Sequence, residues 1–443
     1  MIKSDSRRIK NGDIFVALPG IKSDGHDYIV DAINNGASKV IATHGSYSVD
    51  TVIVDDTRKF LKDYVFSNYS SIIDDMTIIG ITGTNGKTTT SYLIYQSLNK
   101  LGVKCSMIGT LGYYRDRKVC DLSNTCPDLA LIYELLLDSY NSGYKCVVME
   151  ASSQGLAEDR LYGVRFDYAI FTNLTHDHLD YHKSFEKYVC AKKKLFGQLK
   201  SNGIGIVNCD DSYHNYFSCD NLVTYGFGKC DYRIYDSIDY RFSFFDGCSH
   251  VVKHNLIGRY NSYNLMSCII VLLKMGFSMD CILTVIENIY APSGRMEVFN
   301  YSDNSIIVDY AHTPDAIENV LSSISGYNKL YVVFGCTGNR DRLKRPIMTK
   351  LLLSKCDFGI ITCDDLYDES FDSIVSDMLN GVNFNNYCVC YDRGEAIFKG
   401  VSMLRHNDIL LVLGKGHESV IKIGSERIPF NDGECIRNII KSL

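Results

Sequence analysis

Short hydrophobic runs alternate with helix-like segments along most of the chain. From Thr77 onwards the runs "TIIGITG" (77–83), "KCVVMEASS" (145–153), "FDYAIFTNL" (166–174) and "GIGIVNCDD" (203–211) each end in polar or glycine-rich residues, and helical patterns such as "KTTTSYLIYQSLNKLG" (87–102) lie between them. Such alternation is typical of a mostly parallel sheet with helices on both faces. The sequence therefore predicts an α/β protein.

The order and spacing of the predicted strands and helices divide the chain into three groups of elements. Residues 1–74 contain the short runs "GDIFVALPG", "KVIATH" and "TVIVDD", with a helix expected near Tyr28 to Gly36. A last set follows residue 292, with the runs "SIIVDYAHTPDAIENVLSSI", "LYVVFGCTG", "FGIITCDD" and "DILLVLGKGHE". We predict three domains, at residues 1–74, 75–291 and 292–443. Ligands are expected at the polar loops that end the strands, where open α/β sheets bind them.

Composition narrows the class of protein. A chain of 443 residues can form two or three cores, and 46% hydrophobic with 22% charged residues is ordinary for a globular protein. The net charge of -6 argues against a general nucleic-acid or membrane-surface binder. The start "MIKSDSRRIKNGDIF" lacks the apolar segment of a signal peptide, and no apolar run approaches the ~18 residues of a spanning helix. We expect a cytoplasmic protein, a monomer, with no nucleic-acid or membrane partner.

The cysteines do not indicate a metal or disulfide framework. The chain has 17 of them, an odd number with scattered spacing and no C-x-x-C. Reduced thiols that act as small hydrophobic residues are the better interpretation.

The loop "GTNGKTT" (83–89) has the residues that a phosphate site needs. Gly83 and Gly86 let backbone N–H groups approach phosphate oxygens, Lys87 supplies charge, and Thr88 offers a hydroxyl to magnesium. The strict pattern G-x-x-x-x-G-K-[ST] fails, because Ile81 stands where its first glycine belongs. A glycine turn that merely caps a helix is the alternative.

This unusual loop resembles the ATP loop of the Mur ligase family, whose members join amino acids to a cell-wall precursor. Other stretches resemble the same family in the same order, and in particular its UDP-N-acetylmuramoyl-tripeptide synthetases: "DSRRIKNGDIFVALPGIKSDGHDYI", "MEASSQGLAEDR", "FTNLTHDHLDYH", "LIGRYNSYN", "SGRMEVF", "VFGCTGNRDRLKRP" and "GKGHE". The resemblance implies a small N-terminal α/β domain that binds a UDP-sugar, a central P-loop ATPase-like parallel sheet, and a C-terminal Rossmann-like domain. It also implies an ADP-forming ligase that adds an amino acid to UDP-N-acetylmuramoyl-L-alanyl-D-glutamate through an acyl phosphate, in peptidoglycan precursor synthesis.

The resemblance also implies the residues that hold ATP and Mg²⁺. Those for the nucleotide are Gly83, Thr84, Asn85, Gly86, Lys87, Thr88, Thr89, Asn264, Arg295, Asp309 and His312. Those for the metal are Thr88, Glu150, His178 and Lys192, the last as a carbamylated lysine. From the residues alone Glu150 could equally cap a helix, and His178 could belong to a zinc site or a turn. Lys192 would be one of three adjacent lysines, Lys192 to Lys194, on a solvated helix face.

Two further groups follow from the resemblance for the nucleotide-sugar substrate. The uridine end is expected on Ser4, Ser6, Ile21, Lys22 and Ser23, and the reacting carboxylate near Asn124, Thr125, Ser152, Glu158 and Arg160. The chain departs from the family at Cys126, Gln154 and Glu158, where threonine, histidine and glutamine are usual.

The incoming amino acid is expected in the C-terminal domain. Arg340 matches the arginine that takes its α-carboxylate, and Gly414 and Glu418 match residues near its side-chain amine. Diaminopimelate enzymes of the family carry Asp-Asn-Pro-Arg where this chain has Asp364-Asp365-Leu366-Tyr367. The candidates Asp364, Asp365, Tyr367 and Glu418 comprise three carboxylates and a phenol with no cation among them. We therefore predict L-lysine or another diamino acid, and disfavour diaminopimelate.

Three alternatives stay open at this point. The chain could be a ligase of the same mechanism, such as a folylpolyglutamate synthetase, although "DSRRIKNGDIFVALPG" argues against that enzyme. It could be a specialised paralogue with another acceptor. It could also be a non-catalytic nucleotide-binding module, which would not require the full metal set.

Overall fold

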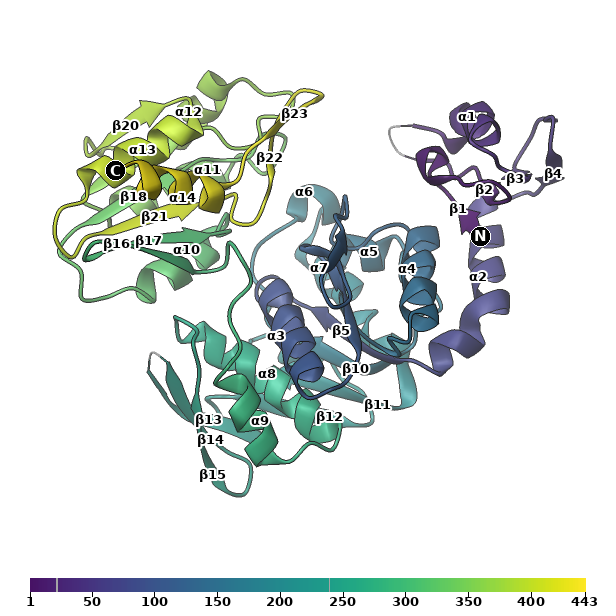
Figure 1. The fold of residues 1–443 in the computed structure, drawn as a ribbon, viewed down its shortest axis with the longest axis horizontal. Coiled ribbons are helices and arrows are strands. Elements are labelled where there is room, and N and C mark those ends of the chain that lie inside the picture. Colours follow the sequence, from purple (N-terminus) through teal and green to yellow (C-terminus); the bar gives the residue numbers. More distant parts are fainter. Residues whose placement is uncertain (21–22, 239) are drawn as a thin grey trace.

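The computed structural model describes residues 1–20, 23–238 and 240–443, which form three large sheets, each with its own helices, and one two-stranded sheet. Figure 1 shows the N-terminal sheet as a separate lobe, joined to the central sheet by the long helix α2 (Thr57–Asp74). The α/β class is confirmed, as is the arrangement of a small N-terminal unit, a central parallel sheet and a C-terminal sheet.

The N-terminal sheet has four parallel strands in the order β1-β2-β3-β4: Ile2–Lys3, Ile14–Val16, Lys39–Ala42 and Asp50–Ile53. The helix expected near Tyr28 to Gly36 is present as the 3₁₀ turn η2 (Gly25–Tyr28) and α1 (Ile29–Asn34). A second 3₁₀ turn, η1, spans Ser6–Arg8. Phe15 and Val40 pack with α1 in a small core. Ile2, Val16 and Ile41 of the same sheet belong to the larger core that includes residues of α2.

The central sheet has eleven strands in the order β15-β14-β13-β12-β11-β10-β5-β9-β6-β7-β8. All neighbours from β13 to β6 are parallel, as predicted, and antiparallel strands extend both ends. The strands are β5 (Thr77–Thr82), β6 (Cys105–Gly109), β7 (Gly112–Tyr114), β8 (Lys118–Cys120), β9 (Cys146–Glu150), β10 (Phe166–Phe171), β11 (Leu199–Asn208), β12 (Leu222–Gly226), β13 (Tyr232–Ile238), β14 (Arg241–Phe245) and β15 (Ser249–Lys253).

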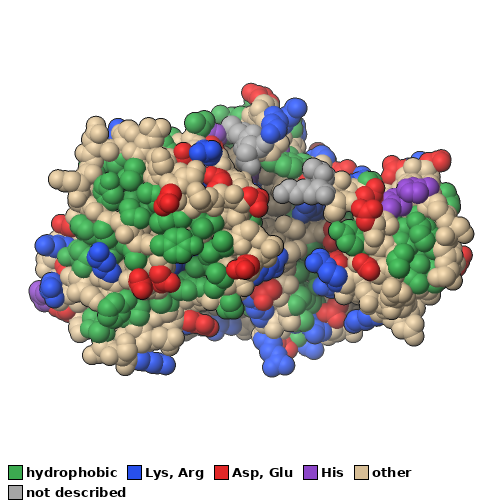
Figure 2. All heavy atoms as spheres, turned by 90° about the horizontal axis from the view of Figure 1, so that it is seen from above, with side chains coloured by type: hydrophobic (Ala, Val, Ile, Leu, Met, Phe, Trp, Pro, Cys, Tyr) green, Lys and Arg blue, Asp and Glu red, His purple; other side chains and the backbone are tan. Residues whose placement is uncertain are grey.

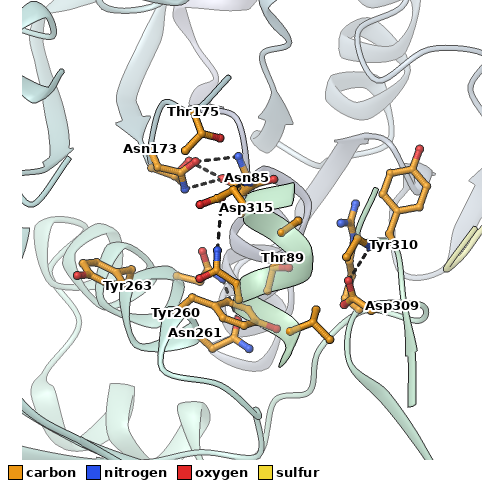
Figure 3. A pocket seen from close by; sticks show the side chains of 18 of the residues that line it. Asn85, Thr89, Asn173, Thr175, Tyr260, Asn261, Tyr263, Asp309, Tyr310 and Asp315 are labelled. Carbon is orange, nitrogen blue, oxygen red and sulfur yellow. Dashed lines mark hydrogen bonds between the residues drawn. The ribbon is translucent and has the colours of Figure 1, made fainter. Parts of the chain in front are cut away.

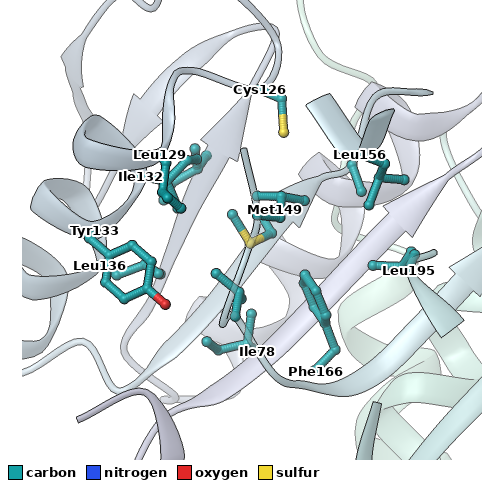
Figure 4. Close-up of a cluster of buried hydrophobic side chains, with 14 of the residues drawn as sticks. Ile78, Cys126, Leu129, Ile132, Tyr133, Leu136, Met149, Leu156, Phe166 and Leu195 are labelled. Carbon is teal, nitrogen blue, oxygen red and sulfur yellow. The ribbon is translucent and has the colours of Figure 1, made fainter. Parts of the chain in front are cut away.

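Helices cover both faces of this sheet because its strands alternate their side chains between two cores. Ile78 points into the core formed with α2, α4 (Leu129–Asn141), α5 (Ser153–Ala157) and α7 (Phe185–Lys193). Its neighbour Ile79 points into the core formed with α3 (Lys87–Lys100), α8 (Tyr260–Lys274) and α9 (Met279–Ile286). Figure 4 shows side chains of α4 beside Met149 of β9. Truncation of Met149 to alanine is expected to cost about 2–5 kcal/mol.

The C-terminal sheet has the order β16-β17-β21-β18-β19-β20, parallel except for the edge strand β16. Its strands are Glu297–Tyr301, Asn304–Asp309, Leu330–Phe334, Phe358–Thr362, Tyr387–Cys390 and Ile409–Leu413 for β16 to β21. One face packs on α10 (Pro314–Ser322), α11 (Lys344–Leu353) and α12 (Phe371–Leu379). The other packs on α13 (Arg393–Met403) and α14 (Asp432–Ser442). The sheet is therefore wound on both sides, like a Rossmann domain.

A two-stranded hairpin lies beyond the end of this sheet, formed by β22 (Val420–Ile423) and β23 (Glu426–Pro429). The amide of Leu366 donates to the carbonyl of Lys422 at 2.8 Å, which ties the hairpin to the loop after β19. The pattern of the sequence did not indicate this hairpin.

The mixed charge of the surface and the length of the helices can be compared with what the composition indicated. On the face drawn in Figure 2, acidic and basic side chains are interspersed with apolar ones. Among the described residues no helix is both long and apolar enough to cross a membrane.

Candidate active site

The glycine loop joins β5 to α3 and is held by the residues that follow the neighbouring strand β10. Thr84 N donates to Asn173 O at 2.8 Å, and Asn85 N donates to Asn173 Oδ1 at 2.9 Å. Gly83 (φ 152°) and Gly86 (φ 86°) have positive φ, and a Cβ added to Gly83 would lie 1.9 Å from Thr172 Oγ1. The two glycines are therefore required by backbone geometry and close packing. Gly86 is the N-cap of α3, as the alternative interpretation expected, but the rest of the loop also lines a cavity.

Lys87 folds back over this loop. Its ammonium donates to Gly83 O at 2.8 Å and Thr84 O at 2.9 Å. Burial lowers the pKa of Lys87, while the Glu150 carboxylate opposes that shift. A desolvated cation placed among loop amides is the arrangement that stabilises phosphate charge.

Glu150 ends β9 and lies beside the loop. Its carboxylate accepts from Thr88 Oγ1 at 2.9 Å, Thr110 N at 2.7 Å and Thr110 Oγ1 at 3.0 Å. All three donors are neutral, so this buried carboxylate can still coordinate a cation. The helix-capping alternative for Glu150 is wrong, since Ser152 caps α5 by accepting from Gly155 N. Thr110 was missed because "GTLGYY" carries no recognisable pattern.

Lys192 is almost fully buried on α7. Its ammonium donates to Gly83 O at 2.5 Å and lies 4.6 Å from the centre of the Tyr188 ring. Burial, and then the nearby charge of Lys87, hold the pKa of Lys192 well below its usual range. The solvated helix face that three adjacent lysines suggested is therefore wrong for Lys192, although Lys193 and Lys194 are exposed.

His178 has a positive φ of 55° and an imidazole that is about half exposed, 3.4 Å from Asp177. The zinc alternative finds no support, because the groups of acidic, histidine and cysteine side chains close enough to hold a metal, among the described residues, do not include His178.

One cavity of about 160 Å³ brings the predicted catalytic residues together. Its lining includes Lys87, Thr88, Glu150, His178 and Lys192. Hydroxyl and carboxylate oxygens are ligands that Mg²⁺ prefers, so the donor set of Thr88 and Glu150 fits that ion. Asp177 also lines the cavity and was missed at the sequence level, although it lies in "THDHLDYH".

A second cavity, of about 280 Å³, adjoins the first and lies between the central and C-terminal sheets (Figure 3). It is lined by Asn85, Gly86, Thr89, Asn264, Arg295, Asp309 and His312 of the predicted nucleotide set, with the rings of Tyr260 and Tyr263. Asn85 Nδ2 donates to Asp315 Oδ2 of α10 at 2.8 Å, so the glycine loop contacts the C-terminal domain directly. Asp315 was missed in the sequence.

Arg295 and Asp309 shape the boundary between these cavities. Arg295 lies over the Tyr310 ring, 4.5 Å from its centre, and reaches Thr88 Oγ1 at 3.5 Å. Asp309 accepts from Met296 N and Ala311 N, both at 2.8 Å, and burial raises its pKa. Asp309 therefore stabilises the backbone around it and also lines the cavity.

The residues expected for the nucleotide-sugar fall in two places. Thr125 and Ser152 line the cavity with Lys87, and Asn124 beside them is exposed. Ser4 lies on the N-terminal unit and donates to Asp128 Oδ1 at 2.7 Å; Ser6 is buried there, and Ser23 is exposed. Ile21 and Lys22 lie outside the described residues.

Arg160 is already paired. It donates to Glu158 Oε2 at 2.6 Å through Nη2 and to Cys126 O at 2.7 Å through Nη1. Burial acts to raise the pKa of Glu158, but Gln154 and Arg160 outweigh it and hold that pKa below its usual range. Two of the unusual residues, Gln154 and Glu158, therefore bond to each other, at 3.1 Å.

The structure corrects the charge assigned to the amino-acid pocket. Asp364, Asp365 and Glu418 do lie together, but Lys415 Nζ contacts all three at 3.6, 2.8 and 2.7 Å. Lys422 Nζ contacts Asp365 at 2.9 Å and Tyr367 Oη at 3.3 Å. The prediction of a pocket without a cation is wrong. Lys415 stood in "GKGHE" and could have been found there, whereas Lys422 comes from the hairpin that was not predicted.

Gly414 and Arg340 complete the predicted set. Gly414 has φ 108°, and a Cβ there would lie 2.7 Å from Asp364 Oδ2, so glycine lets the acidic cluster approach the backbone. Arg340 is exposed, with its guanidinium carbon 6.0 Å from the centre of the Tyr367 ring.

Comparison with known proteins decides the family. Three family models match in order: "Mur ligase family, catalytic domain" at residues 1–65, "Mur ligase middle domain" at 81–272, and "Mur ligase, glutamate ligase domain" at 294–416. The chain belongs to the Mur ligase family. It is accordingly an ATP-dependent, ADP-forming ligase of a carboxylate and an amine.

Curated relatives match over the whole chain. The UDP-N-acetylmuramoyl-L-alanyl-D-glutamate--2,6-diaminopimelate ligase of Aquifex aeolicus is 38% identical over 451 residues, covering 99% of this chain and 93% of the relative. The enzyme of the same name from Fusobacterium nucleatum is 38% identical over 458 residues, covering 99% and 93%.

Solved structures agree on the fold. A structure of a ligase of that same name covers 100% of this chain and 94% of its own, with a TM-score of 0.67 and 30% identity. A folylpolyglutamate synthase of Mycobacterium tuberculosis covers 80% of this chain and 92% of its own, with a TM-score of 0.66 but only 12% identity. That second likeness shows a common fold alone.

Proposed function

We propose that this protein joins a diamino acid to UDP-N-acetylmuramoyl-L-alanyl-D-glutamate in peptidoglycan precursor synthesis, at the expense of ATP. The observation that carries the proposal is the single cavity in which Lys87, Thr88, Glu150 and Lys192 converge. The names of the full-length relatives supply the acceptor and the class of amino acid.

The chemistry asks the site to neutralise several negative charges at once. The acceptor carboxylate attacks the γ-phosphorus of ATP, and the bond between that phosphorus and the β,γ-bridging oxygen breaks. The products of this step are an acyl phosphate and ADP. The uncharged amine of the amino acid then attacks the acyl carbon, loses a proton, and releases inorganic phosphate. Bound Mg²⁺ supplies part of the charge neutralisation in this reaction. Lys87 and the loop amides supply the rest, and Thr88 with Glu150 holds the ion.

Lys192 fits a carbamylated lysine. Its burial and its low pKa favour the neutral amine, which adds to carbon dioxide and loses a proton to give a carbamate. That step places an anion near Lys87, where a second buried cation would be costly to desolvate. A carbamate there would help to orient a cation held by Glu150.

The nucleotide fits between two domains. Its base and ribose would occupy the cavity of Figure 3. The hydrogen bond from Asn85 to Asp315 joins the glycine loop to the C-terminal domain when that domain closes over the nucleotide. Arg340 and the pocket around Tyr367 bind the amino acid, and closure brings its amine to the acyl phosphate. A cytoplasmic setting belongs to this proposal, because free ATP and the chain's free thiols suit that compartment.

The test is a measurement of ADP and phosphate release by the purified protein. UDP-N-acetylmuramoyl-L-alanyl-D-glutamate is supplied with each of L-lysine, L-ornithine, meso-diaminopimelate and L-alanine. We expect ADP release that depends on the nucleotide-sugar together with a diamino acid. Release that needs neither substrate, or that needs a folate instead, would overturn the proposal.

A further inference from the structure

We propose that Lys422 and Tyr367 read a second carboxylate on the incoming amino acid, in place of the arginine that is absent from position 367. The inference rests on the proposed function and names the substrate class within it, an amino acid with a carboxylate at each end, as in 2,6-diaminopimelate.

The geometry places two cations against one ring. Lys422 Nζ lies 5.4 Å from the centre of the Tyr367 ring, and the Arg340 guanidinium lies 6.0 Å from the same point. Among the described residues, Arg340 has no carboxylate within ion-pair distance. One cation is needed for the α-carboxylate that every amino acid carries. Lys422 adds a second cation at this place, which beyond its pairing with Asp365 suits a second anion on the substrate.

Lys422 has capacity left for a ligand. An ammonium offers three donors, and here Asp365 Oδ2 and Tyr367 Oη take two of them, at 2.9 and 3.3 Å. The side chain of Lys422 retains 27% of its exposure. The phenol of Tyr367 can turn its own hydrogen toward the same ligand. Lysine and phenol together form one hydrogen-bonding site at the rim of the pocket.

The acidic residues are occupied by a different cation. Lys415 is fully buried and contacts Asp364, Asp365 and Glu418, so it offsets one of their three charges, and Lys422 offsets a second through Asp365. Asp365 also accepts from the backbone N–H of Lys422 at 3.0 Å. The ammonium of a lysine substrate would therefore find these carboxylates already engaged. The net charge of the pocket that was predicted to select an ammonium is therefore closer to neutral, and its accessible positive charge lies on Lys422.

The position of Lys422 does not depend on its side chain. Its carbonyl accepts from Leu366 N and Tyr367 N, at 2.8 and 3.2 Å, and Gly424 N donates to Tyr367 O at 2.7 Å. Tyr367 itself has a left-handed φ of 50°, which these bonds hold in place. Substitution of the side chain at position 422 thus leaves the hairpin joined to the loop and tests recognition rather than folding.

The experiment compares kcat/KM for meso-diaminopimelate and L-lysine in the wild type and in Lys422→Gln, Lys422→Arg and Tyr367→Phe. Arg427→Gln is the matched control, because Arg427 faces Lys422 across the hairpin and is exposed. We expect meso-diaminopimelate to be the better substrate of the wild type. Lys422→Gln should lower its kcat/KM by about tenfold or more, through KM, with L-lysine changed less than about twofold.

The other variants sharpen the assignment. Lys422→Arg should keep most of the preference for meso-diaminopimelate over L-lysine. Tyr367→Phe should lower kcat/KM for meso-diaminopimelate by a few-fold. The double variant Lys422→Gln with Tyr367→Arg should recover diaminopimelate use, because it returns a cation from the loop that Lys422 contacts. Arg427→Gln should behave as the wild type.

Two failures are distinguishable. Equal losses for both amino acids in Lys422→Gln, or a wild type that prefers L-lysine, overturn this inference and leave the ligase function intact. The absence of ADP release with any diamino acid in a folded wild-type protein overturns the proposed function and this inference with it.

Discussion

Thr88 donates its hydroxyl hydrogen to Glu150 Oε2 at 2.9 Å, although the two residues are 62 positions apart in the chain. The bond joins the start of α3 to the end of β9, at the edge of the parallel sheet where the strands of such folds deliver ligand-binding groups. It places a hydroxyl and a carboxylate side by side next to the glycine loop. The proposed cation site and the proposed phosphate site therefore share one set of contacts.

Lys87→Ala should abolish ligation and ADP release together. The ammonium is the buried cation of the glycine loop, and removal of such a charge from a transition state costs at least about 10²–10³ in rate. Lys100→Ala, at the exposed end of the same helix, is the control and should be unaffected. Product formation by Lys87→Ala at more than about a tenth of the wild-type rate would remove Lys87 from its role.

Thr88→Val should raise the concentration of Mg²⁺ needed for half-maximal activity. The substitution keeps the shape of the side chain but deletes the hydroxyl beside Glu150. We expect kcat at saturating Mg²⁺ to fall by about tenfold or more. A magnesium titration that superimposes on that of the wild type would show that the hydroxyl does not serve the metal.

Lys192→Ala should be nearly inactive, and short carboxylic acids such as acetate or propionate should restore part of the activity. The expectation follows from a buried amine of low pKa, because a carbamate is needed there as an anion. Lys193→Ala is exposed and is the matched control. An intact-mass or ¹³C NMR measurement on the wild type in ¹³C-bicarbonate should show the carbamate carbon. Its absence, with full activity, would contradict the assignment.

Asp315→Ala should weaken closure of the C-terminal domain over the nucleotide. The substitution removes the acceptor of the Asn85 side chain, and a hydrogen bond to a charged group contributes about 1.5–3 kcal/mol. We expect kcat/KM for ATP to fall by about tenfold. Glu318→Ala on the exposed side of the same helix provides the comparison, and equal behaviour of the two variants would show that the contact is incidental.

His417 should make the protein less stable as the pH falls. Burial, and then the charges of Arg295 and other cations, lower the pKa of His417 to about 3. The unfolded chain, with a histidine pKa of about 6.5, takes up a proton that the folded chain refuses. The contribution of His417 is therefore fully present above pH ~6.5 and is lost as the pH falls toward 3. In His417→Gln the thermal midpoint should depend less steeply on pH between 6.5 and 4, and an unchanged slope would rule out this source.

Much of the site could be predicted because its residues follow strands. Lys87 and Thr88 come directly after β5 and Glu150 ends β9, and parallel strands bring those ends to one edge. The partners that were missed come from elements without a strong pattern. Thr110 lies in a tight turn between β6 and β7, and Lys422 lies on a short hairpin whose strand is only partly buried. The error in pocket charge had the same origin, because sequence cannot show which lysine folds onto which carboxylate.

The most direct test of the account follows oxygen from the acceptor to phosphate. UDP-N-acetylmuramoyl-L-alanyl-D-glutamate is prepared with ¹⁸O in the reacting carboxylate and is incubated with ATP, Mg²⁺ and meso-diaminopimelate. An acyl phosphate requires one ¹⁸O atom to appear in the inorganic phosphate for each amide bond formed, together with ADP. Inorganic phosphate without the label, or label in AMP, would contradict the mechanism.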